Sequence, residues 1–177
     1  MLLAEKVCLI TGGGSGIGEA TAKLFASEGA FVIITDVDEK AANGVVSEIG
    51  PKAKFINCDV TQEKQVHDTI KKIVEIYDRL DCAVNNAGIT GTPSNIEHTT
   101  LENWSNVIAV NLTGVFLCLK HEITQMIKQG SGSIVNVSSG AGLIAVPSMA
   151  AYCASKHALL GLTKTAATEN LSRGIRV

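Results

Sequence analysis

The sequence TGGGSGIG occupies residues 11–18, and the residues on either side of it decide how the chain folds. A short apolar run at residues 7–11 leads into it and is typical of a buried strand, while apolar residues recur at helical spacing over residues 16–29. Such a glycine-rich turn can be an ordinary connection from a strand to a helix. It can also bind a phosphate, because the first N–H groups of the helix and the positive end of its dipole lie there.

Five positions in this turn are candidate nucleotide-binding residues. Gly12 permits a tight turn, Gly16 removes a side chain where a pyrophosphate would approach the backbone, and Gly18 lets the helix lie close to the sheet. Ser15 and Ile17 lie between these glycines and complete the set. A glycine cluster alone is weak support for a nucleotide site. The strand before it and the helix after it support such a site more strongly than the glycines themselves.

The next predicted strand, residues 31–35, ends at Asp36. A carboxylate at this position accepts hydrogen bonds from the ribose hydroxyls of adenosine and repels a 2′-phosphate. Ser15 and Val37, where a basic side chain would bind that phosphate, are uncharged. Asp36 could also cap the following helix, because further acidic residues come after it. The two roles are compatible, and the sequence favours NAD over NADP.

Strand-like and helical patterns continue to alternate along the rest of the chain, in units of about 30 residues. The strand-like segments are residues 7–11, 31–35, 54–58, 80–84 and 133–137. This alternation implies βαβ crossovers and a parallel sheet. We therefore expect an α/β, doubly wound Rossmann fold with three α/β/α layers, formed by residues 1–177 as a single NAD(P)-binding domain. We expect a sixth strand that begins at residues 175–177 and is cut short, and no seventh strand within residues 1–177.

Composition and charge argue against several other classes of protein. Hydrophobic residues make up 46% and charged residues 18% of the chain, which is typical of a folded globular domain. The formal net charge of −2 gives no reason to expect a nucleic acid or an anionic membrane as a partner. The N-terminus lacks the pattern of a secretory signal, and no apolar run approaches the ~20 residues of a membrane helix. The five cysteines show no metal-ligand spacing, so we expect reduced thiols, no metal site and a cytoplasmic location.

Two long helices are expected, at residues 99–129 and 151–171. Thr99 and Glu102 form a capping-box pattern at the start of the first one. That helix is apolar on more than one side, although a helix packed on its own sheet needs only one apolar stripe. The surplus indicates a second burial partner, such as another subunit.

Tyr152 and Lys156 are four residues apart in the second of these helices, so their side chains lie on one face of it. A free tyrosine titrates near ~10, which is too high for a base at neutral pH, and a neighbouring ammonium favours the phenolate. Such a tyrosine can take a proton from an alcohol, or give one to a ketone oxygen, while a nicotinamide carries the hydride. The Tyr-x-x-x-Lys spacing alone is common in unrelated helices.

Further motifs accompany this pair in a fixed order along the chain. They are Asp59-Val60, Asn85-Asn86-Ala87-Gly88, Asn111, Ser139 and Tyr152-Cys153-Ala154-Ser155-Lys156. Together with the TGxxxGxG spacing of residues 11–18, this set resembles the short-chain dehydrogenase/reductase family of the TGxxxGxG and YxxxK type. The resemblance covers essentially the whole chain.

The resemblance implies a catalytic set of Asn111, Ser139, Tyr152 and Lys156. Ser139 lies thirteen residues before Tyr152, as in that family, and would orient the substrate oxygen. Ser138 is the nearby rival for this role. Asn111 would hold a water that links Lys156 to solvent, and Lys156 would also hold the nicotinamide ribose.

The resemblance also implies how cofactor and subunits are bound. Asp59 and Val60 would hold the adenine, and Asn86 would belong to the cofactor site. The long helices at residues 99–129 and 151–171 would pack across a twofold axis, which predicts a homodimer or homotetramer.

The sequence departs from the family in its C-terminal part. The turn that contacts the nicotinamide amide, the helical substrate lid and the seventh strand have no counterpart in residues 1–177. Whether these residues are active alone is therefore left open. The apolar segment at residues 143–149 indicates a hydrophobic alcohol or ketone as substrate, with cyclic ones among the candidates.

The predicted function is that of an NAD-dependent oxidoreductase that interconverts a secondary alcohol and a ketone, with Tyr152 as general acid/base. The alternative is a non-catalytic NAD-binding protein, or an inactive truncated fragment that acts only through oligomeric contacts. The presence of Ser139, Tyr152 and Lys156 together favours the enzyme.

Overall fold

The computed structural model describes residues 1–177, in which six parallel strands form one sheet. The strands are β1 (Val7–Thr11), β2 (Phe31–Asp36), β3 (Ala53–Asn57), β4 (Cys82–Asn85), β5 (Gly132–Asn136) and β6 (Ile175–Arg176). Their order across the sheet is β3-β2-β1-β4-β5-β6, so the chain builds outward from β1 in one direction and from β4 in the other. This order confirms the predicted doubly wound Rossmann fold.

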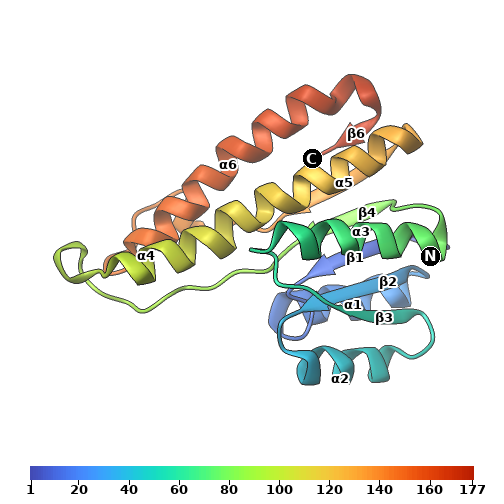
Figure 1. Cartoon of the computed structure of the whole chain (residues 1–177), viewed down its shortest axis with the longest axis horizontal. Helices are drawn as coiled ribbons and strands as arrows, with labels where there is room; N and C mark the ends of the chain where they lie inside the picture. Colours follow the sequence, from blue (N-terminus) through green and yellow to red (C-terminus); the bar gives the residue numbers. More distant parts are fainter.

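Helices connect the strands and cover both faces of the sheet (Figure 1). They are α1 (Gly16–Ser27), α2 (Glu39–Ile49), α3 (Glu63–Tyr77), α4 (Leu101–Ile108), α5 (Val115–Gln129) and α6 (Ala150–Asn170). A π-helical segment, η2 (Ala109–Gly114), joins α4 to α5, and short 3₁₀ turns lie at η1 (Ile96–His98), η3 (Gly140–Gly142) and η4 (Leu171–Arg173). Helices α1 and α2 pack on one face, while α3, α5 and α6 pack on the other.

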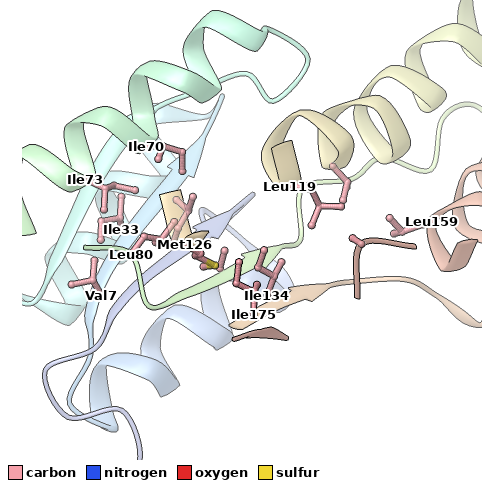
Figure 2. Close-up of a cluster of buried hydrophobic side chains, with 14 residues drawn as sticks. Val7, Ile33, Ile70, Ile73, Leu80, Leu119, Met126, Ile134, Leu159 and Ile175 are labelled. Carbon is pink, nitrogen blue, oxygen red and sulfur yellow. The ribbon is translucent and has the colours of Figure 1, made fainter. Parts of the chain in front are cut away.

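Buried side chains form two main clusters because successive residues of a strand point to opposite faces. Val7 and Leu9 of β1 belong to the cluster under α3, α5 and α6, which Figure 2 shows around Met126. Cys8 and Ile10, their neighbours in the strand, belong to the cluster under α1 and α2. Burial on both faces explains why β1 reads as a continuous apolar run rather than as an alternating one.

The helix predicted at residues 99–129 is capped one residue later than expected. The Thr100 hydroxyl accepts a hydrogen bond from the Asn103 N–H at 3.1 Å, so Thr100 is the N-cap. The prediction that Thr99 is the cap is wrong, because the Thr99 hydroxyl instead donates to the Asn95 carbonyl at 3.0 Å. The second long helix, α6, lies within one residue of its predicted bounds.

The stretch Leu101–Gln129 is long and apolar enough, by length and composition, to cross a membrane, with a window of mean hydropathy 1.3. Reading the sequence for uninterrupted apolar runs does not reveal it, because polar residues interrupt the stretch. In the protein, 44% of that window is buried, and α5 packs against α3 and the sheet. Core helices of globular proteins have the same composition, so this is weak support for a membrane span.

All five cysteines are free thiols. Cys8, Cys58 and Cys118 are buried, and Cys82 and Cys153 are partly exposed. Burial raises the pKa of the Cys58 and Cys118 thiols, so these two side chains stay protonated and unreactive. The cytoplasmic location stays a prediction.

A buried polar network joins β4, β5, α5 and α6 at the carboxyl end of the sheet. The Asn85 amide donates to Glu122 Oε2 and to Asn136 Oδ1, each at 3.0 Å. The Asn136 amide donates in turn to Thr163 Oγ1 at 2.9 Å. Glu122 has no exposed surface, and this burial raises the pKa of its carboxyl to about 7, against the opposing effect of the Asn85 bond. The carboxyl is therefore protonated in the folded protein over most of the acidic range.

Replacing Glu122 with Gln should remove a pH dependence of stability. The folded carboxyl holds its proton up to about pH 7, whereas an ordinary glutamate loses it near pH 4.5. The contribution of Glu122 to the free energy of unfolding is therefore fully present below pH 4.5 and is lost as the pH rises through about 7. The whole difference is about 3 kcal/mol for a shift of this size.

Urea unfolding of the wild type and of Glu122→Gln across this pH range measures the effect. Glu102→Gln, which changes an exposed glutamate in α4, is the matched control and should keep the dependence of the wild type. An equal loss of stability with rising pH in the wild type and in Glu122→Gln contradicts the assignment.

Candidate active site

A cavity of about 450 Å³ lies at the carboxyl ends of β1, β2, β4 and β5. Its position spans β1 and β4, where the strand order reverses and where open α/β sheets bind their ligands. Its volume suits a small organic ligand. All the predicted cofactor-binding residues except Gly18 line it: Gly12, Ser15, Gly16, Ile17, Asp36, Asp59, Val60, Asn86, Tyr152 and Lys156.

The glycine-rich turn forms one end of this cavity and leads directly into α1. Ser15 is the N-cap of α1 but makes no hydrogen bond with its side chain, so the first N–H groups of the helix are left without a side-chain cap. No atom lies within 4 Å of the place where a Cβ of Gly16 would be, which leaves open space in front of this backbone. The turn therefore fits a pyrophosphate. Gly18 does not line the cavity, and a Cβ there would clash with the Gly12 carbonyl oxygen, so only glycine lets α1 lie this close to the turn.

Asp36 is held in place by two backbone N–H groups. Its Oδ2 accepts from Gly14 at 2.9 Å, and its Oδ1 accepts from Asp38 at 3.0 Å. The cap of α2 is Asp38, whose side chain accepts from the Ala41 N–H at 3.0 Å. Asp36 is therefore free of the capping role and presents a fixed carboxylate to the cavity, beside the uncharged Val37.

The glycine-rich turn is fastened to the end of β4 through Thr11, a residue to which the sequence assigned no role. The buried Thr11 hydroxyl accepts hydrogen bonds from the N–H groups of Asn86 at 3.0 Å and of Ala87 at 3.1 Å. The Asn86 amide donates to the carbonyls of Thr11 at 3.0 Å and Gly12 at 2.9 Å. Asn86 thus lines the cavity while its amide group holds the turn.

Asp59 and Val60 line the cavity just after β3. The Asp59 Oδ1 accepts hydrogen bonds from the N–H of Thr61 at 2.9 Å and from its hydroxyl at 2.8 Å. These bonds fix the side chain and leave its other oxygen, Oδ2, available to a ligand. The contact of Asp59 and Val60 with adenine stays a prediction.

Tyr152 and Lys156 lie one turn apart in α6, and both line the cavity. The Lys156 ammonium is 5.7 Å from the centre of the Tyr152 ring, which confirms that the two side chains share one face of the helix. The same ammonium donates to the Val137 carbonyl at 2.8 Å, just beyond the end of β5. Burial lowers the pKa of Lys156. This arrangement brings a cation and a phenol together in the cavity that also contains Asp36 and the glycine-rich turn.

Asn111 lies in the π-helical segment η2 and is fully buried behind the cavity. Its Oδ1 accepts from the Ile89 N–H at 2.8 Å, and its amide donates to the Ile89 carbonyl at 2.8 Å and to the Ser155 hydroxyl at 3.2 Å. Ser155 donates to the Tyr152 carbonyl at 2.7 Å. Asn111 therefore connects the wall of the cavity to the helix that carries Tyr152 and Lys156. The role of holding a water stays a prediction.

Ser138 and Ser139 both follow β5, and the structure gives them different surroundings. Ser138 lines the cavity, and its hydroxyl donates to the Lys156 carbonyl at 3.2 Å. Ser139 caps η3, and its hydroxyl oxygen accepts from the Ala141 N–H at 3.1 Å. The hydroxyl hydrogen of Ser139 is thus still available for donation. The preference for Ser139 over Ser138 as the substrate-orienting residue stays a prediction.

Comparison with known proteins shows which family this chain belongs to. The family model described as short chain dehydrogenase matches residues 6–177. The chain is 40% identical to a 2,5-dichloro-2,5-cyclohexadiene-1,4-diol dehydrogenase of Sphingobium indicum, over 99% of this chain and 70% of that protein. It is 41% identical to a cyclohexanol dehydrogenase of Acinetobacter sp., over 98% of this chain and 70% of that protein.

A solved structure agrees with these matches. The crystal structure described as NAD⁺-bound xylitol dehydrogenase superposes with a TM-score of 0.97 at 37% identity, over 100% of this chain and 69% of that chain. The chain therefore belongs to the short-chain dehydrogenase family and is an oxidoreductase that acts on CH–OH groups.

Proposed function

We propose that the protein is an NAD-dependent oxidoreductase that interconverts a secondary alcohol and a ketone, with Tyr152 as the general acid/base. The observation that carries the proposal is that Tyr152 and Lys156 share one cavity with the glycine-rich turn and Asp36. A cavity that binds a cofactor without performing chemistry has no need of the tyrosine and lysine pair at its other end.

The residues that would hold NAD are spread along the cavity. The backbone around Gly16 would bind the pyrophosphate, Asp36 the adenosine ribose and Lys156 the nicotinamide ribose, with Asp59 and Val60 near the adenine. When bound, NAD supplies the nicotinamide that accepts a hydride from the alcohol or returns it to the ketone.

Tyr152 would manage the proton of the reacting oxygen. In oxidation its phenolate accepts the proton of the alcohol hydroxyl, and in reduction its hydroxyl donates a proton to the ketone oxygen. The Lys156 ammonium lies 5.7 Å from the centre of the Tyr152 ring, beside the proposed path of this proton. The Ser139 hydroxyl would donate a hydrogen bond to the substrate oxygen and so fix its orientation.

Two observations support NAD rather than NADP. The Asp36 carboxylate faces the cavity, and Ser15 and Val37 beside it carry no positive charge for a 2′-phosphate. The solved relative with a TM-score of 0.97 is described with NAD⁺ bound.

We propose a hydrophobic secondary alcohol, with cyclic alcohols foremost, as the substrate. The two relatives above are named for a cyclohexadiene diol and for cyclohexanol. In this chain, Leu143 and Ile144 lie between Ser139 and Tyr152 with 74% and 64% of their surface exposed, where they could cover an apolar ring.

A homodimer or homotetramer is proposed for the assembly. Leu101, Trp104 and Phe116 remain exposed on the continuous stretch of α4, η2 and α5, although they are large and apolar. Helices α4 and α6 lie side by side and extend away from the strands (Figure 1). A second copy of the chain would bury these side chains.

Replacing Tyr152 with Phe should abolish turnover and leave cofactor binding intact. The variant keeps the ring and loses only the hydroxyl, so kcat should fall by about 10²-fold or more because the proton has no carrier. The dissociation constant for NADH, measured by fluorescence titration, should stay close to that of the wild type.

Tyr77→Phe is the matched control for this substitution. Tyr77 is the other tyrosine of the chain, and it packs against Phe31, with ring centres 5.4 Å apart, rather than lining the cavity. Its substitution should leave kcat unchanged. Turnover that survives in Tyr152→Phe contradicts the proposed mechanism.

Replacing Asp36 with Asn should weaken the discrimination against NADP. The amide is close in shape to the carboxylate and can still accept a hydrogen bond from Gly14, but it no longer repels a 2′-phosphate. The ratio of kcat/KM with NAD to kcat/KM with NADP should fall by about tenfold, which corresponds to about 1.4 kcal/mol.

Asp38→Asn serves as the control, because Asp38 is exposed and caps α2 outside the cavity. Its cofactor ratio should match that of the wild type. The same ratio in Asp36→Asn and in the wild type argues against Asp36 as the residue that selects NAD.

A further inference from the structure

The segment at residues 89–92 belongs to the loop that leads from β4 toward α4 (Figure 1). Ile89 and Thr90 line the cavity. The segment starts next to the proposed catalytic end, because a Cβ on Gly88 would lie 3.7 Å from the Lys156 ammonium. Ile89 and Thr90 therefore form a wall of the cavity near Lys156, and Gly91 and Thr92 continue this wall toward α4 outside the cavity lining.

Two asparagines hold this wall in the same way. The Asn111 side chain pairs with both the N–H and the carbonyl of Ile89, each at 2.8 Å. The Asn103 side chain pairs with both the N–H and the carbonyl of Thr92, each at 2.9 Å. Each carboxamide thus imitates the pairing of a neighbouring strand and satisfies backbone groups that have left the sheet.

The backbone between these two pairs also fits closely against the helix. Gly91 has a φ of +72°, and a Cβ there would lie 2.7 Å from Asn103 Oδ1 and 2.5 Å from a methyl group of Val107. A residue with a side chain would push the segment away from α4. Asn103, Gly91 and Asn111 together make a continuous clamp over residues 89–92. Asn103 belongs to none of the motifs that mark the family.

The clamped segment continues to the start of α6. The Ser94 N–H donates to the Ser148 carbonyl at 2.9 Å, and the Ser148 hydroxyl donates to Asn95 Oδ1 at 3.0 Å. Ser148 lies four residues before Tyr152. The position of the wall is therefore coupled to both sides of the proposed catalytic end.

We propose that Asn103 is a positioning residue for the nicotinamide half of the cofactor. It holds the wall at residues 89–92 in the binding conformation before the cofactor arrives. Without the Asn103–Thr92 pair the wall spends only part of its time in that conformation, and the affinity falls by that fraction. The inference rests on the proposed function, because it takes the bound cofactor to be NAD.

The test compares NAD⁺ with AMP, which has only the adenosine end of the cofactor. Isothermal titration calorimetry of the whole chain gives the dissociation constant for each ligand. Asn103→Ala removes both hydrogen bonds to Thr92. Asn103→Asp keeps the shape but places an oxygen, instead of the amide donor, against the Thr92 carbonyl.

Both variants should raise the dissociation constant for NAD⁺ by about tenfold, as for the loss of about 1.4 kcal/mol. The dissociation constant for AMP should change less than about twofold, which corresponds to under about 0.4 kcal/mol. The reason is that AMP would contact Asp36, Asp59 and Val60 and not the wall. Asn106→Ala is the matched control, because Asn106 is exposed in the next turn of α4 and its side chain makes no hydrogen bond. It should change neither constant.

Two outcomes overturn the inference while leaving the proposed function intact. In one, the Asn103 variants bind NAD⁺ as tightly as the wild type. In the other, they lose affinity for NAD⁺ and AMP equally, which indicates general loss of structure. A wild-type chain that binds AMP but not NAD⁺, or neither ligand, overturns the proposed function and the inference with it.

Discussion

The hydrogen bonds between Thr11 and residues 86–87 are the constraint on which the site depends. At the carboxyl ends of β1 and β4 the ladder between the strands stops, and the N–H groups of Asn86 and Ala87 would be left without partners. The buried Thr11 hydroxyl accepts both, and the Asn86 amide returns two hydrogen bonds to the carbonyls of Thr11 and Gly12. The glycine-rich turn and the chain that follows β4 toward Lys156 therefore cannot move independently.

The same solution recurs along the segment that follows β4. Asn86, Asn103 and Asn111 each use the side-chain amide to satisfy a backbone carbonyl, and the last two also accept from an N–H. A carboxamide is suited to this because it carries a donor and an acceptor in one plane. The cavity is thus built from loops, but its walls are tied to β1, α4 and η2. This allows a site at the ends of strands to be formed before a ligand binds.

Features that depend on local sequence could be predicted, and features that depend on the path of a loop could not. The central strands β1 and β2 are recognisable because burial on both faces makes each an apolar run. The glycine-rich turn, Asp36 and the spacing of Tyr152 and Lys156 are likewise readable from short stretches. The roles of Thr11 and Asn103 arise only when segments distant in sequence meet. The shift of the cap from Thr99 to Thr100 was unpredictable for a related reason, since Asn95 competes for the Thr99 hydroxyl. Of the two serines after β5, Ser139 is favoured as the substrate-orienting residue only by its spacing from Tyr152. Ser138, and not Ser139, lines the cavity.

The central claim is that this cavity moves a hydride between an alcohol carbon and NAD. The most direct measurement uses cyclohexanol that carries deuterium on its carbinol carbon, incubated with the protein and NAD⁺, followed by mass spectrometry of the reduced cofactor. Hydride transfer at this site predicts one deuterium in each molecule of NADH formed. NADH without deuterium, or no NADH from any secondary alcohol tested in this way, would contradict the claim.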